Sequence, residues 1–419
     1  MSKCIENPRT SCALGGALAV ATGVERVIPI FHAGPGCGLQ VSIGQKTGYI
    51  GGIGCPSTNM FEKEVVFGGI QRLRETIEGS LEVMDGDLYV VLTGCTSGII
   101  GDDVDSVVNE FKRKGVPILN VQTSGFKGDT YYGYEITLDA LVNALTETSP
   151  KKEKTINLFG IVPHQDIFWQ GNFEELTRIL NKLGIKVNTF FTEHQGIETI
   201  KKSSEAALNV VLSPWLLKDL AETYQNKFDV DTYRYPGLPI GPTATSKFIR
   251  ELSEKLNLDR NDVEKVIEEE EDYVYSHFER NIGVVSNYRF IIVGDANTVI
   301  GVTKFLANDY SQVPLLAVIT DDIPKVYHAK IEEVANLEYG RKPKVVFETD
   351  KWKISELIRE FEDEATLLMG SSFEKEIGNE LDIFTTLVSY PNTETFIINK
   401  GYAGYRGCLT FLEDLYNNN

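Results

Sequence analysis

The stretch that decides the fold is DLYVVLTGCTSGIIGDD, residues 87–103. Its first half is an apolar run of the length of a buried strand, and the run ends in a glycine followed by a segment that can begin a helix. Strand, glycine turn and helix in this order are typical of a parallel sheet covered by helices. Cys95 in this turn therefore lies beyond the carboxyl end of a predicted strand, where ligands bind in doubly wound sheets.

The same pattern recurs outward from this stretch in both directions. In the first third of the chain, ERVIPIFHAG and VPILNVQTSG are apolar runs that also end in glycine, and GGIQRLRETIEGSLEVM is a predicted helix between them. A second unit follows the charged linker TSPKKEKT at 148–155, and a third follows an acidic helix at 262–281, whose glutamate run is interpreted as a solvated face. With 419 residues and about 150 residues per domain, we expect an α/β protein of three Rossmann-like domains, each a mostly parallel sheet flanked by helices. Their predicted ranges are 1–150, 151–285 and 286–419.

Composition excludes several classes of function. A net charge of −19 without basic runs argues against nucleic acid as a partner. No stretch approaches the roughly 18 consecutive apolar residues of a membrane span, so we expect no membrane association. None of the three units contains a complete Gly-x-Gly-x-x-Gly fingerprint or a Walker loop. The first ten residues, MSKCIENPRT, lack the pattern of a secretory signal, so a cytoplasmic protein with reduced cysteines is expected.

Three cysteines in glycine-rich turns are the candidate metal ligands. They are Cys12 in SCALGG, Cys37 in HAGPGCG and Cys95 in LTGCTSG. Small neighbours such as Gly36 and Gly94 let the backbone approach an inorganic core and donate N–H groups to its sulfides. Cys12 also opens a predicted helix, whose dipole favours a thiolate. The alternative for each cysteine alone is a buried free thiol, but three in such turns predict an iron–sulfur cluster.

Several other residues can be interpreted either as functional or as structural. Cys55 in GGIGCPSTN is either an additional ligand or a neighbour of the cluster, whereas Cys408 is expected to be a core thiol on an apolar helix. Asp102 and Asp103 are redox-active or ligating carboxylates or, as we favour, caps of a helix N-terminus. His32, before Cys37, either hydrogen-bonds near the cluster or has a structural role.

The motifs together resemble a known family. NPRTSCALGGA, FHAGPGCG, FEKEVVFGG, LTGCTSGIIGDD, TSGFKG and the terminal GYAGYRGCLTFLEDLYN resemble nitrogenase component 1 and its relatives nearly end to end. The intervals between the three cysteines resemble those of the β subunit of the molybdenum-iron protein rather than the α subunit. The resemblance implies three α/β domains per subunit. It also implies an interface at which two unlike subunits each give three cysteines to a P-cluster, here Cys12, Cys37 and Cys95.

The resemblance also implies what this chain lacks. The α subunit holds an iron-molybdenum cofactor through a cysteine in its second domain and a histidine in its third. Here Ser213 lies near the place of that cysteine and no histidine follows His328, so we expect no such cofactor. Some β subunits offer a serine ligand in the loop that corresponds to TSGFKG, where this chain has Gly125, with Ser124 one residue earlier. Gly125 is thus a candidate cofactor contact, and an [8Fe-7S] P-cluster and a [4Fe-4S] cluster both stay open.

The resemblance implies a β-like subunit of a nitrogenase or nitrogenase-like reductase. Such a subunit would take electrons from an ATP-dependent iron protein and pass them to an active site in an α-like partner, in an α2β2 assembly. A homodimer that shares cysteines is the alternative assembly. The alternative functions are the catalytic component of a tetrapyrrole or methylthio-alkane reductase and a non-catalytic scaffold for assembly of the nitrogenase cofactor.

Overall fold

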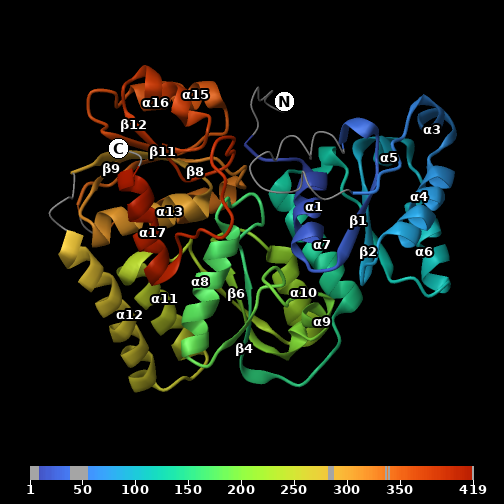
Figure 1. Ribbon diagram of the computed structural model, residues 1–419, viewed down its shortest axis with the longest axis horizontal. Helices are drawn as coiled ribbons and strands as arrows, with labels where there is room; N and C mark the ends of the chain where they lie inside the picture. The colour runs from blue at the N-terminus through green and yellow to red at the C-terminus, as the bar shows by residue number, and fades with distance from the viewer. Residues whose placement is uncertain (1–8, 38–54, 282–286, 336, 338–339, 418–419) are drawn as a thin grey trace.

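The computed structural model describes residues 9–37, 55–281, 287–335, 337 and 340–417. Over these residues the chain forms three parallel sheets flanked by helices, so the predicted α/β class is confirmed (Figure 1). The domain boundaries at 150 and 285 stay a prediction. Among the described residues, no helix is both long and apolar enough to cross a membrane.

The first sheet carries the candidate ligands at its carboxyl edge. All six residues of its middle strand are buried, as expected for a strand covered on both faces. The strands, in the order β1-β2-β3, are β1 (Val27–His32), β2 (Leu88–Thr93) and β3 (Ile118–Val121). The helices are α1 (Ala13–Gly23), α3 (Glu62–Phe67), α4 (Ile70–Val83), α5 (Cys95–Ile100), α6 (Val104–Arg113) and α7 (Thr130–Leu145), with a 3-10 turn η1 (Gly125–Lys127).

The second sheet has four parallel strands in the order β5-β4-β6-β7. These are β4 (Lys152–Phe159), β5 (Lys186–Asn188), β6 (Ala206–Leu212) and β7 (Asp231–Tyr235). Its helices are α8 (Trp169–Lys182), α9 (Ile197–Lys201), α10 (Lys218–Phe228), α11 (Gly241–Lys255) and α12 (Arg260–Asn281), and a 3-10 turn η2 (Ser203–Glu205) precedes β6.

The third sheet has five parallel strands in the order β10-β9-β8-β11-β12. These are β8 (Arg289–Gly294), β9 (Val313–Ile319), β10 (Lys344–Phe347), β11 (Leu367–Gly370) and β12 (Phe384–Leu387). Its helices are α13 (Ala296–Lys304), α14 (His328–Ala335), α15 (Lys351–Arg359) and α16 (Glu374–Glu380), with a π-helical turn η4 (Phe305–Asp309) and a 3-10 turn η5 (Lys325–Tyr327). The last helix, α17 (Gly404–Asn417), returns to the second unit and packs on α8, α11 and α12 (Figure 1).

Two sequence predictions are wrong in part. The charged segment read as a linker contributes to β4, because Lys152 already pairs with Ala206 of β6 while its side chain stays exposed. The glutamate run of α12 is not wholly solvated, because the Glu270 side chain is 2 % exposed and pairs with Arg178 and Lys182. Burial opposes ionisation of Glu270, but the hydrogen bonds from these two cations outweigh it and lower its pKa to about 2.

The N-terminal segment is anchored to the third sheet by a buried ion pair. Arg9 Nη1 donates to Glu374 Oε2 at 3.1 Å, and both side chains are almost fully buried. Because a buried charge without its partner is strongly destabilising, this pair fixes where the residues from Arg9 to Cys12 lie.

Helices α1 and α7 make direct backbone contact at their first turns. A Cβ added at Gly16 would lie 2.0 Å from the Thr130 carbonyl oxygen, and a Cβ added at Gly133 would lie 2.0 Å from the Ala13 carbonyl oxygen. No side chain fits at either place. The two glycines therefore set the distance between the start of α1 and the loop before α7 (Figure 1).

This contact predicts that Gly133→Ala destabilises the protein although alanine is the better helix former. An alanine in an open helix position stabilises by up to about 1 kcal/mol relative to glycine, whereas overpacking costs about 1–3 kcal/mol. Gly79→Ala in α4 is the matched control, because nothing lies within 4 Å of its added Cβ. Thermal unfolding followed by circular dichroism should show a lower Tm for G133A and an equal or higher Tm for G79A. Equal Tm values for the two variants would show that the helices can separate at no cost.

Candidate metal centre

Cys12 lies at the N-cap position of α1, as predicted, and its side chain is exposed. The backbone around it is fixed by the loop that precedes α7. The Ala13 N–H donates to the Gly128 carbonyl at 2.9 Å, and Cys12 forms an isolated antiparallel bridge with Asp129. The sulfur therefore leaves the helix start next to the TSGFKG loop.

Cys37 and Cys95 come from the turns after β1 and β2. Cys95 is the first residue of α5, directly after Gly94, and Cys37 lies in helical backbone at 35–37. A Cβ added at Gly94 would lie 3.6 Å from Cys37 Sγ, and the Gly94 N–H donates to the His32 carbonyl at 3.0 Å. The two turns are thus in contact through the glycine that precedes Cys95.

Gly125 lies against two of the three cysteines, Cys12 and Cys95. A Cβ added there would lie 3.1 Å from Cys95 Sγ and 3.2 Å from Cys12 Sγ. The structure therefore brings the three predicted cysteines together, with the loop backbone at Gly125 against two of the sulfurs. Gly36, by contrast, has nothing within 4 Å of an added Cβ, and its role as a cofactor contact stays a prediction.

The electrostatics agree with this grouping. Burial raises the pKa of the Cys37 thiol, and the charges of Cys12 and Cys95 raise it further. Among the described residues, no three His, Cys, Asp or Glu side chains are placed to hold a single metal ion. Three soft sulfur donors with glycine backbone beside them suit a polynuclear iron–sulfur core rather than one ion. By donor chemistry, the residues present fit such a group.

The remaining two described cysteines differ from this group. Cys55 is partly buried, and burial alone raises its pKa to about 11, with no contribution from another cysteine. Its role as a fourth ligand stays a prediction. Cys408 is fully buried on α17 and its thiol donates to the Tyr405 carbonyl at 3.0 Å, so the prediction of a core thiol is confirmed.

Both serines considered in the sequence analysis, Ser124 and Ser213, form hydrogen bonds within the chain. Ser124 is buried, and its hydroxyl donates to the Gly94 carbonyl at 3.1 Å, which joins the TSGFKG loop to the turn before Cys95. Ser213 is buried beyond β6, where its hydroxyl accepts from the Trp215 and Leu216 N–H groups at 3.3 and 3.2 Å. Both hydroxyls thus have structural partners.

The two aspartates of the GDD motif have different roles. Asp103 caps α6 by accepting from the Ser106 N–H at 3.0 Å, as predicted. The same prediction is wrong for Asp102, which does not cap α6. Its carboxylate instead accepts from the Gly69 N–H and contacts His32, a non-local arrangement that the motif alone does not show.

Exposed apolar side chains next to the cysteines were not predicted from the sequence. Helix α3 has no buried residue, and Phe67 on it is 83 % exposed. Helix α3 contacts α5, on which Ile99 is 75 % exposed, and Phe126 of η1 lies against α5 at Gly98 (Figure 1). The sequence FEKEVVF indicates this surface, because it places large apolar side chains on or next to one short helix whose residues are not buried in the fold.

A second missed feature is a group of carboxylates where the three units meet. Tyr131 of α7 donates to Asp321 at 3.0 Å, and Asp321 also accepts from the Ala296 N–H at 3.1 Å. Burial raises the pKa of Asp166 to about 7, and repulsion from Asp295 adds to it. These residues are far apart in the sequence, so no local pattern could have revealed the group.

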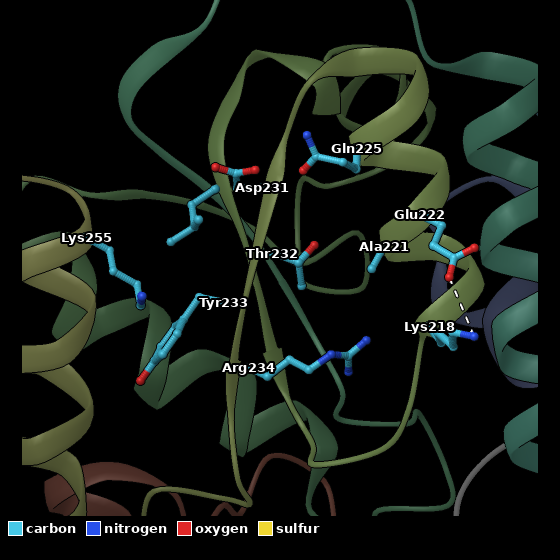
Figure 2. A pocket seen from close by; sticks show the side chains of 10 residues that line it. Lys218, Ala221, Glu222, Gln225, Asp231, Thr232, Tyr233, Arg234 and Lys255 are labelled. Atoms are coloured by element: carbon cyan, nitrogen blue, oxygen red, sulfur yellow. Dashed lines mark ion pairs between the residues drawn. The ribbon is translucent and has the colours of Figure 1, made fainter.

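A groove of about 590 Å³ along β7, the edge strand of the second sheet, is lined by none of the cysteines (Figure 2). Its cationic side chains already have partners. Arg234 donates to the Leu216 and Leu217 carbonyls, and Lys255 Nζ lies 5.0 Å from the centre of the Tyr233 ring. With neither thiols nor imidazoles in its lining, the groove is not a candidate for the metal centre.

Comparison with known proteins agrees with the fold and with the family that the motifs resemble. The family model of the nitrogenase component 1 type oxidoreductases matches residues 12–419. The molybdenum-iron protein beta chain of Azotobacter vinelandii is 23% identical over 447 residues, which covers 98% of this chain and 83% of that protein. The vanadium-iron protein beta chain of Trichormus variabilis is 24% identical over 440 residues, with 96% and 91% covered. A solved structure of nitrogenase Cp1 at pH 6.5 superposes with a TM-score of 0.82 at 21% identity, covers 100% of this chain and 94% of that chain, and so shows the fold.

The packing at Gly125 predicts that Gly125→Ala impairs metal loading while Gly36→Ala does not. An added methyl at Gly125 would press on Cys12 and Cys95, whereas one at Gly36 meets open space. We expect anaerobically purified G125A to retain less than half of the wild-type iron, and G36A to retain nearly all of it. Iron per chain is measured by inductively coupled plasma mass spectrometry. Full iron in G125A would mean that the group does not lie against this loop.

Proposed function

Because the chain belongs to the nitrogenase component 1 type oxidoreductases, we propose that it is a β-like subunit that holds an iron–sulfur cluster at an interface with a partner chain. The observation that carries this proposal is the convergence of three cysteines: Cys12 and Cys95 lie against Gly125, and Cys37 is close enough to both for their charges to raise its pKa. The relatives named as molybdenum-iron and vanadium-iron beta chains support the β-like assignment. In this role the subunit relays electrons from an ATP-dependent iron protein to an active site in the partner.

The residues of this chain would bind and tune the cluster. When bound, an iron–sulfur cluster supplies one-electron redox chemistry at a potential that its surroundings set. Cys12 and Cys95 lie at helix starts, where backbone N–H groups are available to donate to cluster sulfides. The backbone at Gly125 lies close enough to the sulfurs to shield them from water on one side.

The ligand count supports an interfacial cluster. Three cysteines cannot complete a [4Fe-4S] cluster, which needs four ligands, and they are half of the set implied by the resemblance for an [8Fe-7S] P-cluster. A partner chain would supply the rest. Cys12 is exposed, and the first unit carries further exposed apolar side chains, Phe126 and Ile99 at α5 and Phe67 on α3, which contacts α5, as expected for a surface that another chain covers. An α-like partner in an α2β2 assembly is the favoured arrangement.

The active site is assigned to the partner because the described groups at the junction of the units are carboxylates rather than soft ligands. Ser213 stands near the place that the resemblance gives to a ligating cysteine, and its hydroxyl is bonded to backbone. The junction itself is lined by the carboxylates of Asp166, Asp295 and Asp321. These are hard oxygen donors, unsuited to an iron–sulfur cofactor.

The proposal predicts a specific pattern of iron loss among cysteine variants. Cys12→Ala, Cys37→Ala and Cys95→Ala should each lose most of the iron and acid-labile sulfide of the complex purified anaerobically with its partner. Cys55→Ala should keep both the iron and the sulfide, because the charges of the other cysteines do not contribute to the pKa shift of Cys55 and so do not place it in their group. Iron, sulfide and the visible absorption of the brown protein are measured per complex.

Native mass spectrometry of the same complex tests the interface. We expect the cluster mass on the assembled complex and its loss when the chains separate. A stable monomer that carries a full cluster would contradict the interfacial proposal. A triple variant of Cys12, Cys37 and Cys95 with wild-type iron would contradict the ligand assignment.

A further inference from the structure

A buried histidine and aspartate lie behind the cysteine turns. His32 is fully buried at the end of β1, and its Nε2 lies 2.8 Å from Asp102 Oδ2. Burial lowers the pKa of His32, and the neighbouring Asp102 only partly offsets this, so the ring is neutral near pH 7. Because a carboxylate oxygen can only accept, Nε2 carries the proton of this hydrogen bond.

Asp102 also binds the start of helix α4. Both of its oxygens accept from the Gly69 N–H, at 3.1 and 3.0 Å, and Gly69 is the N-cap residue of α4. A Cβ added at Gly69 would lie 2.8 Å from Asp102 Oδ2 and 2.9 Å from His32 Cε1, so the contact requires glycine. One carboxylate thus joins the end of β1 to the start of α4.

The residues joined in this way flank two of the cysteines. Asp102 follows α5, the helix that begins with Cys95, and His32 ends the strand that leads to the turn of Cys37. The Gly94 N–H donates to the His32 carbonyl at 3.0 Å, which closes the connection between the two turns. Beside the pairing of β1 with β2, the link between His32 and Asp102 is thus a second connection between the elements that carry the two turns.

Stability alone does not account for this link. His32 Nδ1 is buried without a hydrogen-bond partner among the described residues, and an unsatisfied buried polar atom costs about 1–3 kcal/mol. A buried hydrogen bond between a neutral ring and a carboxylate, with one ring nitrogen left unsatisfied, is a weak source of stability, and the best-attested role of buried polar groups is to fix a particular arrangement. The link therefore serves to set position.

We propose that Asp102 and His32 are positioning residues that hold the Cys37 and Cys95 turns at the separation that the bound cluster needs. This inference rests on the proposed function. A cluster whose ligands shift changes its reduction potential, because distortion and the hydrogen bonds around the sulfurs both tune it. Position and charge can be separated by comparing Asp102→Ala, which removes the link, with Asp102→Asn, which keeps an oxygen for Gly69 and an amide that donates to His32 Nε2 once the ring carries its proton on Nδ1.

The test is a redox titration of the anaerobic complex followed by electron paramagnetic resonance. For D102A we expect about a tenfold change in the ratio of reduced to oxidised cluster at a fixed potential, which corresponds to about 59 mV for one electron, together with an altered signal shape. D102N should stay within about twofold of the wild type. Asp103→Ala is the matched control, because it removes the neighbouring carboxylate and a helix cap and so lowers Tm, yet touches neither cysteine turn.

The outcomes separate this inference from the proposed function. A wild-type complex without a cluster refutes the proposed function, and the inference with it. A D102A complex with full iron and the wild-type potential refutes the inference alone. Equal shifts in D102A and D102N would show that the charge of Asp102 acts, not its position.

If D102A does not accumulate, the pair His32→Leu and His32→Gln decides the matter, because only glutamine can still donate to Asp102. We then expect the shift in H32L and its recovery in H32Q. The wild-type potential in H32L, or an equal shift in both variants, would overturn the inference.

Discussion

The backbone contact between the first turns of α1 and α7, at Gly16 and Gly133, is the constraint on which the rest of the site depends. Two helix starts meet there with no side chain between them. As a result, the turn that carries Cys12 lies against the loop that contains Gly125, although these residues are more than one hundred positions apart. The same placement of α7 directs Tyr131 toward Asp321 of the third unit. One close contact therefore positions a sulfur and joins the first unit to the third.

The cysteine group has the character of half a site. On its inner side lie glycine backbone, the Ser124 hydroxyl bonded to Gly94 and the buried pair of His32 and Asp102. On its outer side lie the exposed Cys12 and large apolar side chains on α3, α5 and η1. This interior and exterior suit the proposed interfacial site, in which the chain fixes its own ligands in advance and a partner would cover the exposed side.

Local pattern predicted the parts of the fold that depend on local chemistry. Apolar runs that end in glycine marked β1, β2 and β3, and the residues after Cys12 form the predicted helix. Cys37 and Cys95 could be grouped from their turns, because parallel strands place successive turns at one edge of a sheet, whereas Cys12 was identified by its glycine-rich helix start. What could not be predicted depends on residues far apart in sequence. The burial of Glu270 needs Arg178 from α8, and Asp102 left its expected capping role because Gly69 comes close to it in the folded chain. Neither contact produces a periodic pattern in the sequence from which it could have been predicted.

The central claim is that Cys12, Cys37 and Cys95 hold iron at a surface shared with another chain. Anomalous diffraction at the iron absorption edge, from crystals of the complex grown without oxygen, tests it most directly. The account predicts a strong anomalous peak beside Gly125, within bonding distance of the three sulfurs and of ligands from a second chain. A peak next to Ser213 or among the carboxylates of the junction, or none near Gly125 in iron-containing crystals, would contradict it.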